Sequence, residues 1–238
     1  MKTMRSLIKQ TYSYKETIGI IISDSQKAIE AGKQAIQEHR RQLEKYILQN
    51  PIFLYSLEPV NLSDGPIVAK KMANASEKAG VGPMAAVAGV LADLTVNAMI
   101  TTGAKVAVVE DGGEASAISN MPIDIALSAG NNVLSKHLGF RLEHFPIGVA
   151  TSSGKFSHAL SFGDADAVTI FAENAGIADA AATAVGNVVR GNNITRAVKS
   201  GIHKAMSIEG VKGVFILYED KVGKAGEIPR IIGIKDNP

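Results

Sequence analysis

A carboxylate and a hydroxyl one helical turn apart are the pair of residues in this sequence best suited to hold a metal ion. Asp179 and Thr183 lie in a stretch of small and apolar residues, 177–189, that predicts a helix. Positions i and i+4 share a helix face, so both side chains point the same way. Burying a carboxylate among alanines is costly unless a partner offsets its charge, and Mg²⁺ held by few protein oxygens and a ligand's phosphates is one such partner. The alternative is an exposed Asp at a helix start, which the helix dipole favours.

Two further segments contain residues that could contact a ligand. Gly89 and Asp93 share one face of an expected helix, and small residues there let another backbone or a flat ligand come close. The turn Asp111–Glu114 contains Gly112 and Gly113, which supply positive φ or let the backbone approach a ligand. Close packing against a sheet and an ordinary hairpin turn explain the same two patterns without a ligand.

The order of apolar runs, caps and breakers predicts an α+β fold in which mixed or antiparallel sheets carry long helices on one face. We expect one domain over residues 1–238, compatible with two lobes, whose motif-bearing core spans about 80–190. Strands are expected at 12–23, 52–57, 105–110, 123–127, 147–150, 165–171, 213–218 and 229–234. Helices are expected at 26–49, at 65–102 with a break at 80–83, at 177–189 and at 194–206.

Composition excludes several kinds of site. The chain has no cysteine, which excludes disulfides, thiolate nucleophiles and cysteine-ligated metals, and its 5 histidines show no metal-ligand spacing. Residues 72–187 carry 11 acidic side chains against 5 basic ones, so a cation-dependent site is best placed there. The basic ends lack interleaved aromatic residues, so we expect no nucleic-acid partner.

We also expect no membrane partner. The longest apolar stretch, 84–100, contains Asp93 and Asn97, which argues against a membrane span. Residues 1–5 lead into no apolar segment of a signal peptide. A cytoplasmic protein is therefore expected, and its small-residue helices are compatible with a homodimer.

Four segments, in order, resemble the ApbE family of flavin transferases. Ala88–Asp93 is similar to the family's Lys-Gly-x-x-x-Asp helix, and Asp111–Glu114 to its strand-end Gly-Gly-Asp/Asn. Ala150–Gly154 with His158 is similar to Ala-Thr-Ser-Gly followed by His-x-x-Asp-Pro, and Ala178–Ala184 is nearly identical to Ala-Asp-Ala-Leu-Ala-Thr-Ala. Each motif is unspecific alone, but four in the same order and at similar spacing over about 80–190 are much more specific.

The resemblance implies a T-fold-like architecture that binds FAD and, in active members, moves FMN onto a Thr or Ser of a target protein using Mg²⁺. The metal-binding Asp and Thr of the family correspond to Asp179 and Thr183. Ligand contacts are then expected from Gly89, Asp93, Gly112, Gly113, Glu114, Thr151, Ser152 and Ser153.

Two of these positions have competing interpretations. His158 is the best candidate for a proton carrier because its pKa lies in the useful range, and a surface strand residue is the alternative. Asp93 either orients the ribose of the ligand or caps a buried polar network.

Departures from the family's pattern leave the reaction open. Ala88 stands where the family has Lys, Ser161 and Phe162 stand where it has Asp-Pro, and an additional Ser lengthens the Thr-Ser-Gly element. The chain is most similar to compact ApbE-like proteins of prokaryotes. The alternatives to FMN transfer are a flavin- or nucleotide-binding protein, a Mg²⁺-dependent enzyme acting on another small anionic metabolite, and a structural oligomer.

Overall fold

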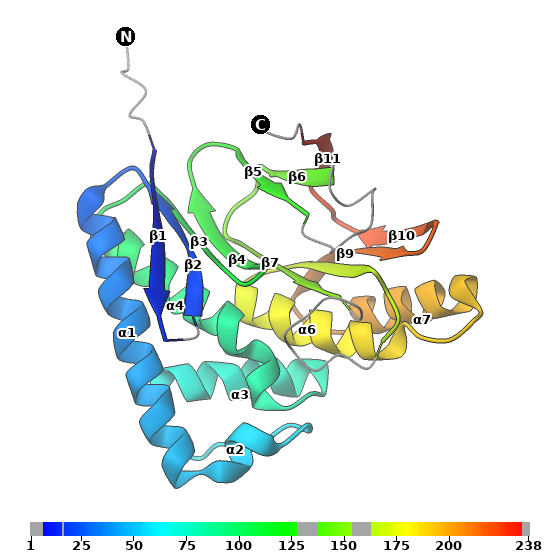
Figure 1. The fold of residues 1–238 in the computed structure, drawn as a ribbon, viewed down its shortest axis with the longest axis horizontal. Helices are drawn as coiled ribbons and strands as arrows, with labels where there is room; N and C mark the ends of the chain where they lie inside the picture. Colours follow the sequence, from blue (N-terminus) through cyan, green and yellow to red (C-terminus); the bar gives the residue numbers. More distant parts are fainter. Residues whose placement is uncertain (1–6, 16, 128–137, 154–162, 235–238) are drawn as a thin grey trace.

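An eight-stranded antiparallel sheet, in the order β1-β2-β3-β4-β7-β8-β9-β10, forms the centre of the molecule (Figure 1). Its strands are β1 (Ile8–Tyr14), β2 (Thr17–Ser23), β3 (Val106–Asp111), β4 (Glu114–Ser119), β7 (Ile147–Ser152), β8 (Ala167–Ala172), β9 (Val211–Tyr218) and β10 (Lys221–Gly226). A three-stranded antiparallel sheet contains β11 (Arg230–Gly233), β6 (Leu138–Leu142) and β5 (Ile123–Ala126) in that order. The computed structural model describes residues 7–15, 17–127, 138–153 and 163–234.

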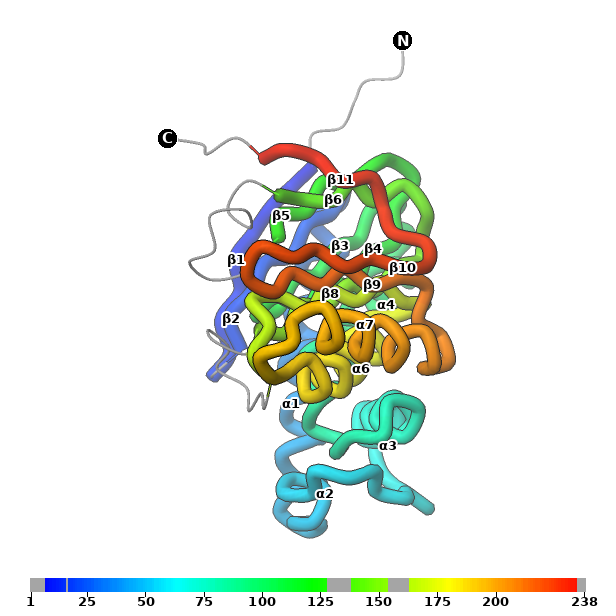
Figure 2. The backbone as a smooth tube through the Cα atoms, turned by 90° about the vertical axis from the view of Figure 1, so that its right-hand side faces the viewer, coloured from blue at the N-terminus to red at the C-terminus, as the bar shows by residue number. Residues whose placement is uncertain are grey.

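Helices cover one face of the large sheet and the small sheet covers the other (Figures 1 and 2). The helices on the sheet are α1 (Gln26–Gln49), α4 (Val87–Thr101), α6 (Ala175–Val188) and α7 (Ile194–Met206). Helix α3 (Ile67–Ala79), the 3₁₀ turn η1 (Pro83–Ala86) and the short α2 (Pro51–Tyr55) lie further from the sheet, and α3 packs against α6. This arrangement confirms the expected α+β class with antiparallel sheets and helices on one face.

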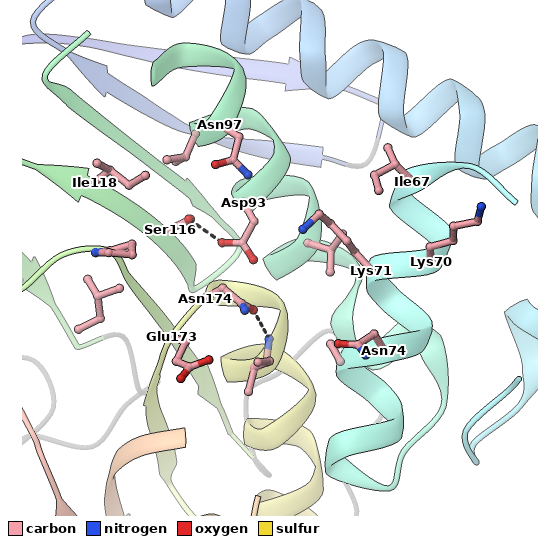
Figure 3. A pocket seen from close by; sticks show the side chains of 16 residues that line it. Ile67, Lys70, Lys71, Asn74, Asp93, Asn97, Ser116, Ile118, Glu173 and Asn174 are labelled. Carbon is pink, nitrogen blue, oxygen red and sulfur yellow. Dashed lines mark hydrogen bonds between the residues drawn. The ribbon is translucent and has the colours of Figure 1, made fainter. Parts of the chain in front are cut away.

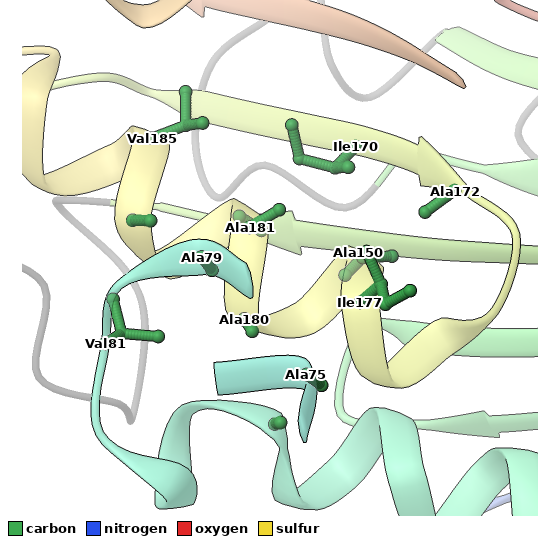
Figure 4. Close-up of a cluster of buried hydrophobic side chains, with 14 of the residues drawn as sticks. Ala75, Ala79, Val81, Ala150, Ile170, Ala172, Ile177, Ala180, Ala181 and Val185 are labelled. Atoms are coloured by element: carbon green, nitrogen blue, oxygen red, sulfur yellow. The ribbon is translucent and has the colours of Figure 1, made fainter. Parts of the chain in front are cut away.

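Small side chains let α6 pack closely between two layers (Figure 4). Ala180, Ala181 and Val185 are buried in a cluster that includes residues of α3 on one side and of β7 and β8 on the other. The partly exposed positions 179, 183 and 187 recur every four residues and form one stripe along α6. Packing therefore explains the alanines, and the polar stripe with Asp179 and Thr183 on one face agrees with the expected helix geometry.

The apolar segment Pro83–Thr101 is long and apolar enough to cross a membrane, and half of it is buried inside the protein. Its α4 portion contacts α1, α6, β3 and β4. Packing in the core of this fold accounts for the apolar composition of the segment.

Aromatic contacts attach the small sheet to the large one. Phe140 of β6 meets Phe171 of β8 and Phe215 of β9 edge-on, with ring centroids 4.9 and 5.5 Å apart. All three rings are buried in a separate cluster on the face opposite the helices. Edge-to-face stacking adds to the apolar burial that holds the two sheets together.

Two expectations about the elements are wrong. The strand expected at 52–57 is the helix α2, because Pro51 is suited to a first helical position and Phe53 buries its ring against Tyr46, 5.3 Å away. The single strand expected at 12–23 is instead part of the β1–β2 hairpin. Its turn includes Lys15 with a positive φ of 54°, which is uncommon for lysine, so the sequence contained no sign of a turn there. Strands β4, β6 and β10 were not expected. Strand β10 consists of two lysines, two glycines, a valine and an alanine, so it has few apolar residues.

Candidate functional site

Helices α4 and α6 cap each other through two aspartates. At the start of α4, Ala86 offers no capping side chain, and Oδ2 of Asp179 on α6 accepts the Gly89 N–H at 3.0 Å. The Ala88 N–H also donates to this carboxylate. A helix start leaves unpaired N–H groups with a partial positive charge, so a carboxylate supplied by another helix stabilises it. This contact fixes Asp179 on the family-like segment that begins α4.

Asp93 of α4 performs the same role for α6. Its Oδ1 accepts the Ala175 N–H at 3.0 Å and its Oδ2 accepts the Gly176 N–H at 2.9 Å. The Ser116 hydroxyl of β4 donates to Oδ1 at 2.7 Å. Burial raises the pKa of Asp93, and the three hydrogen bonds oppose that shift. The structure thus places Asp93 in a capped polar network, one of the two interpretations given above.

Glycine at position 89 permits the close crossing of the two helices. A Cβ added at Gly89 would lie 2.1 Å from the Ala175 carbonyl oxygen and 2.9 Å from Cβ of Asp179. No real Cβ tolerates the first distance, so any larger residue would push α4 and α6 apart. The close neighbour of Gly89 is therefore the backbone of α6.

Carboxylates from the β3–β4 turn face Asp179. The turn has Gly112 at φ 68° and Gly113 at φ 114°, and it brings Asp111 and Glu114 to the end of the two strands. Burial, then the charges of Asp179 and Asp111, raise the pKa of Glu114. Burial and the charge of Asp111 likewise raise the pKa of Asp179, against the Gly89 hydrogen bond that lowers it.

The negative charge of this group is poorly offset by the protein. Burial, followed by the charge of Glu110, raises the pKa of Asp111 to about 6, and the charge of Arg40 lowers it only in part. We name Asp111, Glu114 and Asp179 the acidic cluster. Like charges held together in a partly buried site favour either bound protons or a bound cation.

The third family-like segment runs along β7, beside the turn. β4 pairs with β7 through Ala115 and Val149, and Thr151 lies close to Gly113. The Thr151 hydroxyl shares a hydrogen bond of 3.0 Å with the Thr169 hydroxyl. Ser152 is partly exposed at the end of β7, and Ser153 is buried beyond it.

A cavity of about 390 Å³ opens from this turn onto the face of the sheet opposite the helices. Glu110, Gly113 and Thr151 form part of its polar lining. The remaining lining is largely apolar and includes Ile20, Ile22, Val108, Ala115, Ile123, Ile125, Leu127, Phe140 and Val149. Concave sites with an apolar floor and few polar groups are typical of ligand pockets.

Thr183 lies one turn beyond Asp179, partly exposed. Within the described part of the chain its hydroxyl has no hydrogen-bond partner, although helical threonines often bond to the preceding turn. His158 and the departures Ser161 and Phe162 lie outside the described residues. The described residues from all four family-like segments therefore meet around the turn and the α4–α6 crossing.

Sequence reasoning missed one residue of this site and one contact within it. Asp111 was seen as a turn residue, although its position next to two glycines at a strand end was a usable signal. The mutual capping by Asp93 and Asp179 gave no signal, because it depends on how α4 and α6 cross. Within the described residues no group of three or more His, Cys, Asp or Glu side chains is arranged to hold a metal ion.

Solved structures of ApbE proteins share this fold. The apo form of the Pseudomonas stutzeri flavinyl transferase ApbE matches with a TM-score of 0.60 at 15% identity, over 95% of this chain and 96% of that one. The ApbE protein of Thermotoga maritima matches with a TM-score of 0.59 at 16% identity, over 92% and 97% of the two chains. The protein is thus of the ApbE fold class.

Sequence comparison gives the family. The family model described as AbpE bacteria matches residues 9–211. The UPF0280 protein of Methanococcus vannielii is 42% identical over 231 residues, which is 95% of this chain and 93% of that protein. The UPF0280 protein of Methanocaldococcus jannaschii is 39% identical over 229 residues, 94% and 93% of the two chains. The chain belongs to the AbpE bacteria family, which confirms the resemblance drawn from the four segments.

Proposed function

We propose that this protein binds FAD together with Mg²⁺ at Asp179 and Thr183 and transfers FMN from FAD to a hydroxyl group of a protein acceptor. The observation that carries the proposal is the meeting of the four family-like segments around the acidic cluster. The similar Pseudomonas stutzeri structure is that of a flavinyl transferase, and we extend that activity to this chain as part of the proposal.

The residues present suit Mg²⁺. This ion prefers oxygen ligands and is commonly held by one or two carboxylates, water and substrate phosphates. The Asp179 carboxylate accepts the N–H groups of Gly89 and Ala88 and has further lone pairs for a metal ion, and the Thr183 hydroxyl follows on the same helix face. When bound, Mg²⁺ would neutralise charge on the pyrophosphate of FAD as its P–O bond breaks.

The protein groups supply binding and proton transfer. The apolar cavity beside Gly113 and Thr151 fits a flat flavin ring, with the Gly112 amide next to the phosphates. The Gly113 N–H donates to the Glu110 carboxylate at 3.1 Å and holds the turn. Hydroxyls of Thr151, Ser152 and Ser153 donate hydrogen bonds to phosphate oxygens.

The transfer step balances as follows. The acceptor oxygen forms a bond to the phosphorus of FMN, the pyrophosphate P–O bond breaks, and AMP leaves. His158 takes the proton of the acceptor hydroxyl. Burial first, and then the negative charges of Asp179 and Asp111, raise the pKa of Glu114, and a bound cation would offset that charge.

A second candidate function is binding of FAD, or of another small anionic metabolite, without FMN transfer. The observation that favours it is Ala88 at the start of α4, where the family's lysine would add a cation next to Asp179. Asp179 is also kept in place by its capping role, so its presence alone does not require transfer chemistry.

The test is isothermal titration calorimetry of FAD into the protein with Mg²⁺ and with EDTA, followed by chromatography for AMP. FAD binding that needs Mg²⁺ and is lost in Thr183→Val supports the site. AMP released in step with flavin attached to a Thr-containing acceptor then supports transfer. Binding without AMP release supports the second candidate, and no FAD binding in either buffer rejects the flavin.

We further propose that the protein acts in the cytoplasm as a homodimer and has no nucleic-acid or membrane partner. Light scattering tests the dimer, and a monomer at micromolar concentration would contradict it. Retention on heparin or co-sedimentation with vesicles would contradict the absence of these partners.

A further inference from the structure

A second cavity, of about 400 Å³, lies on the helical side of the large sheet (Figure 3). Residues of α3, α4, β4, the start of β7 and the start of α6 line it, and the turn residues 111–114 do not. Apolar side chains make up much of the lining: Ile67, Val90, Val96, Ile118, Pro146, Ile147 and Ile177. Its volume lies in the range of pockets that take small molecules.

Polar side chains reach this cavity from two helices and from the segment before a third. Lys71 and Asn74 come from α3, Asn97 comes from α4, and Glu173 precedes α6. These four side chains have no hydrogen bond or ion pair to any other described residue. All four side chains are exposed, and the charge of Lys71 acts on Asp93, which also lines the cavity. Charged and amide groups from separate elements therefore converge on the cavity without hydrogen bonds to one another.

The start of α6 offers this cavity no backbone donors. Asp93 accepts the N–H groups of Ala175 and Gly176, and the Asn174 side chain accepts the Ile177 N–H at 2.9 Å. These N–H groups are therefore not available to bind an anion in the cavity. Recognition must come from the side chains and the apolar lining.

The charges at the cavity have opposite signs on different walls. Lys71 lies on the α3 wall and Glu173 on the wall formed by the segment before α6 (Figure 3). Asp93 of α4 also lines the cavity, and its carboxylate accepts the N–H groups of Ala175 and Gly176. Lys70 lies 3.3 Å from Asp64, so Lys71 is the lysine of the pair without an ion-pair partner within the described residues. An ammonium at one wall and a carboxylate at the other complement a ligand that carries both charges.

We propose that this cavity is a second binding site, separate from the flavin site, for a zwitterionic amino acid with an apolar side chain. The ligand carboxylate pairs with Lys71 and its ammonium pairs with Glu173. The amides of Asn74 and Asn97 hydrogen-bond to the same polar end, and the ligand side chain lies on the apolar lining.

The test is calorimetric titration of the wild-type protein with free L-leucine, L-methionine and L-phenylalanine, and with N-acetyl-L-leucine and L-leucinamide. At least one free amino acid should bind, and loss of either charge should weaken binding about fivefold, as expected for a partly exposed ion pair. Lys71→Met should weaken binding of the free amino acid but not binding of L-leucinamide, which has no carboxylate. Glu173→Gln should weaken binding of the free amino acid but not binding of N-acetyl-L-leucine, which has no ammonium group.

Matched variants on α3 serve as controls. Lys78→Met and Glu77→Gln change the same charges outside the cavity and should leave amino-acid binding unchanged. The proposal is overturned when none of the three amino acids binds, or when Lys71→Met and Glu173→Gln bind them as wild type does. Loss of FAD binding in Lys71→Met would also overturn it, because the cavity would then belong to the flavin site.

Discussion

Asp93 and Asp179 both cap the start of a helix, but the charged groups around them differ. Each carboxylate caps the helix that carries the other. Burial raises the pKa of Asp93, whereas its three hydrogen bonds and the charge of Lys71 lower it. Asp179 instead faces Asp111 and Glu114, and burial together with neighbouring negative charges raises the pKa of all three. Both aspartates cap a helix, but only at Asp179 is the negative charge left without a neighbouring cation.

The difference shows which features of the site the fold requires. Capping alone would keep an aspartate at both positions, because each helix start needs acceptors for its N–H groups. It would not place two more carboxylates from the β3–β4 turn beside one of them. We attribute that surplus charge to ligand binding, and the predictions below separate the two contributions.

The largest loss of stability is expected from Asp93→Ala. It leaves the N–H groups of Ala175 and Gly176 and the Ser116 hydroxyl without their acceptor, at a cost of roughly 3–4 kcal/mol in unfolding free energy. Asp179→Ala should cost only about 1 kcal/mol, because relief of repulsion within the acidic cluster offsets the lost cap. Urea unfolding measures both, and equal losses would remove the contrast between the two aspartates.

Gly89→Ala tests the close crossing of α4 and α6. Helix propensity alone would make alanine more stable by about 1 kcal/mol, whereas the contact with the Ala175 carbonyl predicts a net loss of roughly 2 kcal/mol. Gly233→Ala is the control, because a Cβ there meets nothing within 4 Å. A stabilised Gly89→Ala variant would show that the helices are further apart than described.

A pH dependence should mark the acidic cluster. The pKa of Asp111 is raised from 3.8 to about 6 in the folded protein. Its contribution to stability is thus fully present below about pH 4 and is lost as the pH rises through about 6. Asp111→Asn should therefore raise stability by roughly 2 kcal/mol at pH 7.5 and have little effect at pH 3.5. Melting curves of Asp111→Asn across this pH range, compared with those of Asp220→Asn at an exposed turn position, test the prediction.

The smallest effect on stability is expected from Thr183→Val, within about 0.5 kcal/mol, because the hydroxyl has no partner in the described protein. The same variant should lose the response to FAD with Mg²⁺. A large loss of stability without ligand would mean that Thr183 serves packing instead of binding, and thermal melting distinguishes these outcomes.

Local patterns in the sequence were sufficient for much of the fold. The caps and breakers around 26–49 and 80–83 predicted α1 and the α3–α4 break, because they act on their own neighbours. The expected strand at 52–57 failed because the apolar run is too short to separate helix from strand without its contact to Tyr46. The hairpin at Lys15 failed because its turn carries no glycine, asparagine or aspartate at the residue with positive φ.

For the site, the sequence was sufficient to predict individual residues but not the contacts between them. The spacing of Asp179 and Thr183 gave their shared face, which follows from helix geometry alone. The mutual caps and the approach of Asp111 and Glu114 to Asp179 depend on the pairing of β3 with β4 and on the helix crossing. Such contacts join residues more than 60 positions apart and leave no local pattern to read.

One measurement tests the central claim most directly: thermal melting with FAD, with Mg²⁺ and with both, for wild type, Asp93→Asn and Asp179→Asn. A ligand at about 100 times its dissociation constant adds about 2.7 kcal/mol, a rise of several degrees for a protein of this size. Wild type and Asp93→Asn should show that rise only with both ligands, and Asp179→Asn should show none. An equal rise in Asp179→Asn, or none in wild type, would contradict a Mg²⁺-dependent flavin site at Asp179.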